Sequence, residues 1–139
     1  MAAFYTLLYV APITAAESIA LDADEDAMNR YPSAWLRHVG DEELVALWDI
    51  LDAASNEGTL MGDLVYASPD GEVMVMTVPK EFVMALAAAD LESVAQPWQS
   101  TELMQQWSQA DVLAVLQDIT ALCKRSLECG QPVLQVASL

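Results

Sequence analysis

The chain has 139 residues, of which 55% are hydrophobic, and its mean hydropathy is +0.29. This length suits one globular domain over residues 1–139, and the composition excludes the weakly hydrophobic, highly charged class of disordered proteins. Asp and Glu number 21 against 5 Lys and Arg, so the formal net charge is −16. That charge disfavours nucleic acid and anionic membrane surfaces as partners and favours a basic protein, although it could also serve only solubility.

The first apolar run covers residues 4–10 and ends at Ala11-Pro12, which predicts a buried strand. Residues 14–20 could follow as a short helix with Thr14 as its cap. The run has no preceding Lys or Arg, so we do not interpret it as a signal peptide. No run in the chain reaches the roughly 18 apolar residues of a membrane span.

The densest acidic run comes next. It contains Asp22, Asp24, Glu25 and Asp26. The alternate aspartates resemble the start of a calcium loop, but alanine and serine stand where such a loop requires its glycine and its bidentate glutamate. We therefore expect no metal here. The run is either a solvated loop or a surface that recognises a basic partner.

Residues 31–40 read as an irregular segment that contains Trp35 and the only histidine, His38. No catalytic motif surrounds His38, so a structural role is the simpler interpretation. Trp35 lies near a proline outside any predicted helix, which makes it a candidate for a partner surface or a pocket.

An amphipathic helix is predicted over residues 41–54, because leucines and Trp48 recur at helical spacing. Asp41 can cap it, and Glu42 and Glu43 suit the positive end of its dipole. These three acids join Trp35 and the acidic run as the predicted partner-binding residues.

Residues 62–91 predict a β-hairpin followed by a helix. Two short strand-like runs, 64–67 and 72–77, flank the turn sequence Ser68-Pro69-Asp70-Gly71. Pro79 then suits the first turn of a helix that extends to about Leu91. We expect this hairpin to form the middle of the sheet, with the terminal strands outside it.

In the last third of the chain, residues 96–99 interrupt the helical pattern. A short helix is expected from Ser100 or Thr101, and a long amphipathic helix follows it. Ser108 caps the long helix, Gly130 ends it, and residues 133–139 form a final strand. Its two cysteines, at positions 123 and 129, point in different directions and cannot form a disulfide, which suits a reduced, cytoplasmic protein.

Two patterns resemble the YfbM-like family of small bacterial proteins. They are the segment Trp48-Asp49-Ile50-Leu51 followed by a turn at Gly58, and Val78-Pro79 opening a helix before a long final helix and a terminal strand. Asp52 stands where this resemblance would place a histidine. The family has no established activity, so the resemblance implies architecture only and suggests a bacterial origin.

Together these elements predict an α+β fold: one mixed or antiparallel sheet of about four strands, with helices mainly on one face. We interpret the protein as a non-enzymatic binding module, such as an inhibitor, immunity protein or antitoxin, that recognises a basic protein. The alternative is a small-molecule binder. Its apolar pocket would be lined by Trp98, Met74, Met76 and Met84. We expect no cofactor, and apolar terminal strands could pair two subunits.

Overall fold

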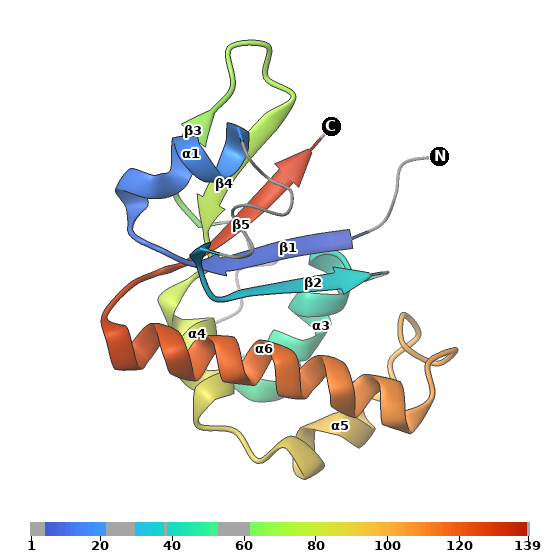
Figure 1. The fold of residues 1–139 in the computed structure, drawn as a ribbon. Helices are drawn as coiled ribbons and strands as arrows, with labels where there is room; N and C mark the ends of the chain where they lie inside the picture. Colours follow the sequence, from blue (N-terminus) through green and yellow to red (C-terminus); the bar gives the residue numbers. More distant parts are fainter. Residues whose placement is uncertain (1–4, 22–29, 38, 53–61, 139) are drawn as a thin grey trace.

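The computed structural model describes residues 5–21, 30–37, 39–52 and 62–138. In chain order its elements are β1 (Tyr5–Val10), the 3₁₀ helix η1 (Ile13–Ala15), α1 (Ala16–Leu21), β2 (Ser33–Arg37), α3 (Asp41–Asp52), β3 (Leu64–Ala67), β4 (Val73–Thr77), α4 (Lys80–Ala87), α5 (Leu91–Gln99), α6 (Gln109–Cys129) and β5 (Val133–Ser138). Figure 1 shows the sheet above a layer of helices crossed by the long α6, with α1 on the opposite side.

The described sheet has five strands in the order β2-β1-β5-β4-β3, and all neighbours are antiparallel. The predicted α+β fold with an antiparallel sheet is therefore confirmed, with one strand more than expected. That strand is β2, which we had interpreted as irregular. The expected order was wrong, because the C-terminal strand β5 lies in the middle and the β3–β4 hairpin lies at one edge.

The terminal strands β1 and β5 each have a neighbour on both sides within the sheet. Their backbone hydrogen-bonding edges are thus used inside the chain, and neither can pair with a second subunit as we had suggested.

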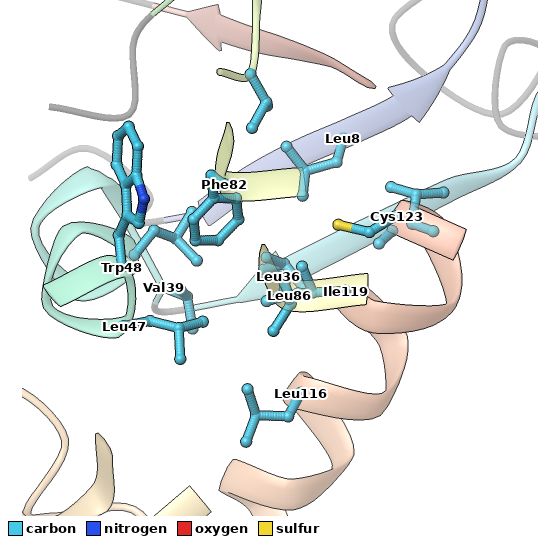
Figure 2. Close-up of a cluster of buried hydrophobic side chains, with 14 of the residues drawn as sticks. Leu8, Leu36, Val39, Leu47, Trp48, Phe82, Leu86, Leu116, Ile119 and Cys123 are labelled. Atoms are coloured by element: carbon cyan, nitrogen blue, oxygen red, sulfur yellow. The ribbon is translucent and has the colours of Figure 1, made fainter. Parts of the chain in front are cut away.

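The larger core lies between the sheet and the helices α3, α4, α5 and α6. Alternation along the strands sends Leu8 and Leu36 into it, because side chains of successive strand residues point to opposite faces. Trp48 of α3 packs edge to face on Phe82 of α4, with ring centroids 5.9 Å apart, and Figure 2 shows this pair beside the leucines of the core. This layer accounts for the predicted arrangement of helices mainly on one face.

A smaller core lies on the other face of the sheet, where Leu7, Tyr9 and Val75 pack with Ile19 of α1. Every one of these four side chains is buried. Because α1 covers only part of this face, the sheet has one thick helical layer and one partial one.

Both predicted ends of the long helix are confirmed. The Ser108 hydroxyl accepts a hydrogen bond from the Asp111 N–H at 3.1 Å, which satisfies one of the free donors of the first turn. At the other end Gly130 has φ 71°, the left-handed conformation that a helix stop commonly adopts.

The hairpin turn is also confirmed. The Gly71 N–H donates to the Ser68 carbonyl at 2.9 Å, and Gly71 has φ 74°. A residue with a Cβ would be strained there.

The helix expected from Pro79 to Leu91 is interrupted. Pro79 is the residue just before α4, and α4 ends at Ala87 before α5 begins at Leu91. α5 contains Pro97, so the expected break over residues 96–99 is helical, and the turns of residues 100–107 replace the short helix expected after it.

Candidate functional site

Most of the predicted acidic surface lies outside the described residues. Asp22, Asp24, Glu25 and Asp26 all fall in the segment 22–29. Asp41 is the first residue of α3, and Glu42 beside it is exposed. Of the predicted partner-binding acids, Glu42 is therefore the one that the structure places on the surface.

Glu43 has a different role from the one we predicted. Its side chain is only 6% exposed, and its carboxylate accepts a hydrogen bond from the Gly40 N–H at 3.0 Å. Gly40 precedes the first turn of α3, so this contact is the glutamate half of a capping box. The backbone carbonyl of Glu43 also accepts a hydrogen bond from the Trp98 indole at 2.9 Å. Glu43 thus joins α3 to α5 and is corrected from a recognition residue to a structural one.

The four residues proposed for a methionine- and tryptophan-lined pocket line none of the three cavities described below. Trp98 is fully buried in α5 and Met76 is 6% exposed, whereas Met84 of α4 is 52% exposed. Met74 is half-buried on β4. Trp98 and Met76 are thus core positions and Met84 is a surface one, and the small-molecule pocket stays a prediction.

Trp35 is exposed, as a partner-binding residue must be. It lies on β2, the last strand at one end of the described sheet, and pairs with Leu7. Opposed residues of an antiparallel pair share a face, so the Trp35 side chain stands on the face away from α6. It is 47% exposed, which is a large apolar area to leave in water.

A groove of about 400 Å³ runs between β2 and α6. It is lined by Pro32, Ser33, Ala34 and Trp35 from the strand side and by Asp118, Ala121, Leu122 and Arg125 from the helix. Ser33 and Ala34 on the strand and Ala121 on the helix have small side chains, which leaves room for a partner's chain. Sequence patterns could not have located it, because they did not identify β2 as a strand.

The groove carries one charge of each sign. Asp118 and Arg125 are both exposed and lie seven residues apart on α6, which is about two turns or roughly 10.5 Å along the helix axis. Within the described part of the chain, neither side chain makes an ion pair. Each is therefore available to a charged group of a bound molecule.

A second groove, of about 350 Å³, lies where α4, the end of α6 and the start of β5 meet. It is lined by Ile13, Val78, Lys80, Val83, Ser126, Leu127, Gly130, Gln131, Pro132 and Val133. These side chains are mainly apolar, and Lys80 is the only charged one among them.

A third cavity adjoins the hairpin turn and includes Asp70 in its lining. Hydrogen bonds from the Ser68 hydroxyl and the Glu72 N–H hold the pKa of the Asp70 carboxyl below its ordinary value. Both donors belong to the same turn. This carboxylate therefore stabilises the turn and is poorly suited to proton transfer near neutral pH.

The two cysteines lie in different surroundings. Both cysteines are unpaired, as expected: Cys123 is buried, which raises its pKa to about 12, and Cys129 is exposed. No cluster of three or more His, Cys, Asp or Glu side chains that could hold a metal ion is present among the described residues. None of the described helices has both the length and the apolar character to cross a membrane.

Comparison with family models, with curated proteins and with solved structures finds no match for this chain. The resemblance to the YfbM-like family therefore stays a prediction.

Proposed function

We propose that the protein is a non-enzymatic binding module in which the end strand β2 receives a segment of a basic partner protein. The partner would contact the groove between β2 and α6 on one face of the strand and the Trp35 side chain on the other. The observation that carries this proposal is Trp35, which is 47% exposed on the strand at one end of the described sheet. Tryptophan is enriched among the residues that dominate binding energy at protein interfaces.

Charge supports a basic partner. The chain carries a formal net charge of −16, and its field accelerates the approach of a positively charged protein. In the groove, Asp118 is placed to pair with a lysine or arginine of the partner, while Arg125 opposes such a group. A basic segment would therefore lie with a lysine or arginine near Asp118 and with an uncharged or acidic residue near Arg125.

The unpaired cysteines support a reducing location, and we place the protein in the cytoplasm. Inhibitors, immunity proteins and antitoxins are the classes that combine small size, acidic charge and an exposed aromatic anchor for a basic partner. The protein fits this group best.

The test begins with a pull-down from the source lysate, followed by kinetics with the purified partner. We expect the association rate to fall at least tenfold between low and high salt, because screening removes long-range attraction. We also expect Trp35→Ala to accelerate dissociation about tenfold or more, since interface tryptophans commonly contribute 2 kcal/mol or more.

Leu103→Ala is the matched control, because Leu103 is also exposed, at 43%, but lies outside the groove. An association rate that does not change with salt would refute the charge argument. Equal dissociation rates for the Trp35 and Leu103 variants would show that Trp35 on β2 does not anchor the partner.

A further inference from the structure

The groove at the junction of α4, α6 and β5 combines apolar walls with one charged group, and this combination is separate from the proposed partner-binding site. Figure 1 shows α6 ending beside α4 before the chain turns into β5, and the two helices are in contact. Val78 and Val83 lie at the α4 side, and Pro132 and Val133 lie at the turn. With Ile13 from η1, three segments distant in sequence thus contribute to one cavity: residue 13, residues 78–83 and residues 126–133.

Two of the lining residues leave large apolar side chains in water. Ile13 of η1 is 52% exposed and Leu127 of α6 is 45% exposed, although both line the same groove. A single exposed apolar side chain is common on protein surfaces. Two such side chains in one groove mark a place where an apolar ligand could bind and shield them from water.

Lys80 gives the groove a positive charge. It is exposed at the start of α4 and makes no ion pair or hydrogen bond through its side chain with any described residue. Of the polar neighbours, the Ser126 hydroxyl is already engaged, because it donates to the backbone carbonyl of Gln131. Among the lining residues the Lys80 ammonium is the only charged group, so a charged headgroup that enters the groove is favoured when it is an anion such as a carboxylate.

We propose that this groove binds a monocarboxylic acid with a short alkyl chain, whose carboxylate pairs with Lys80 and whose chain lies against Ile13, Val83 and Leu127. A cavity of about 350 Å³ holds about twelve groups of water size at about 30 Å³ each, and an acid of eight to ten carbons, with its two oxygens, has about that many non-hydrogen atoms. The net charge of the protein opposes any anion, so the affinity is modest, with a dissociation constant of about 0.1–1 mM.

The test uses octanoate as the acid and octanol as the neutral comparison, with methyl signals in ¹H–¹³C NMR spectra reporting the site. Octanoate is expected to shift the methyl groups of Ile13, Val83 and Leu127 in a saturable way. Lys80→Gln should weaken octanoate binding about fivefold and leave octanol binding unchanged, while Lys80→Arg restores octanoate binding.

Lys124→Gln is the matched control, because it removes the same charge from an exposed position on α6 that does not line the groove. Leu127→Ser should weaken both ligands, since it removes apolar surface that both contact. The proposal is overturned if octanoate causes no saturable shifts, if the Lys80 and Lys124 variants lose octanoate binding equally, or if Lys80→Gln weakens octanol as much as octanoate. None of these outcomes depends on the basic partner, so this proposal and the proposed function fail separately.

Discussion

The hydrogen bond between Trp98 and Glu43 should contribute measurably to stability, and the chain contains a natural control for it. Trp98→Phe keeps an aromatic ring in the core but removes the indole N–H that donates to the Glu43 carbonyl at 2.9 Å. The Glu43 carbonyl lies inside α3 and also accepts the helical N–H four residues on, so it is not left unsatisfied, and loss of the indole bond costs about 0.5–1.5 kcal/mol. The smaller ring adds about 1 kcal/mol for the lost volume. We expect a total loss of about 1.5–2.5 kcal/mol.

Trp48→Phe is the control because the substitution is the same and the burial is nearly equal, at 2% exposed against 0%. The Trp48 indole N–H is buried with no hydrogen-bond partner in the described structure. Removing it relieves an unsatisfied donor, which offsets most of the lost volume, so the expected cost is about 0–1 kcal/mol. The edge-to-face contact with Phe82 remains possible for a phenyl ring.

Urea unfolding of both variants, monitored by circular dichroism, gives the two free energies of unfolding. The difference between them isolates the Trp98–Glu43 hydrogen bond. Equal losses for the two variants would show that the bond contributes nothing and that the junction of α3 and α5 is held by packing alone.

Three further predictions concern single sites. Gly130→Ala should lower the free energy of unfolding by about 1 kcal/mol in the same urea assay, because Gly130 has φ 71°, where an alanine is strained. An added Cβ meets no atom within 4 Å, so backbone strain is the only cost. An unchanged unfolding midpoint would contradict this. The pKa of the Asp70 carboxyl is lower in the folded state than in the unfolded state, where it is about 3.9. The carboxylate therefore stabilises the fold at pH values above about 3.9, and this stabilisation is lost as the pH falls through the folded-state pKa. Asp70→Asn should therefore lower the free energy of unfolding at pH 7, and urea titrations below pH 3.9 should show a smaller loss. A loss that is the same at both pH values would contradict a stabilising role for the hydrogen bonds of Asp70 in the turn. A thiol reagent at pH 8 should modify one cysteine of the native protein, the exposed Cys129, and reach Cys123 only after unfolding, because burial keeps the Cys123 thiol protonated; two fast reactions would refute this.

The elements predicted best from the sequence are those whose signals are local. Ser108 and Gly130 mark the ends of α6, and Asp70-Gly71 marks the hairpin turn, because caps and turns depend on residues next to them in the chain. The order of the strands depends on contacts between distant segments, so no local pattern placed β5 in the middle of the sheet.

The missed elements have equally specific causes. β2 contains Ser33 and Arg37 and follows Pro32, so it lacks the apolar run that identifies a buried strand. α5 contains Pro97, which usually ends a helix, and so its sequence favours a break.

The candidate site was predicted only in part. Trp35 is exposed as expected, but the groove beside it depends on α6 packing against β2, which no spacing in the sequence reveals. Glu43 was assigned to the surface because an acid near a helix start is commonly solvated, whereas its contacts with Gly40 and Trp98 exist only in the folded chain.

The proposed groove between β2 and α6 is tested most directly by the affinity of the purified basic partner for Asp118→Asn and Arg125→Gln. Both residues line the groove and carry opposite charges, and neither makes an ion pair within the described part of the protein. We predict that Asp118→Asn weakens binding and Arg125→Gln strengthens it, each about two- to fivefold. Unchanged affinities, or changes in the same direction for both variants, would contradict the proposal that a basic segment lies in this groove.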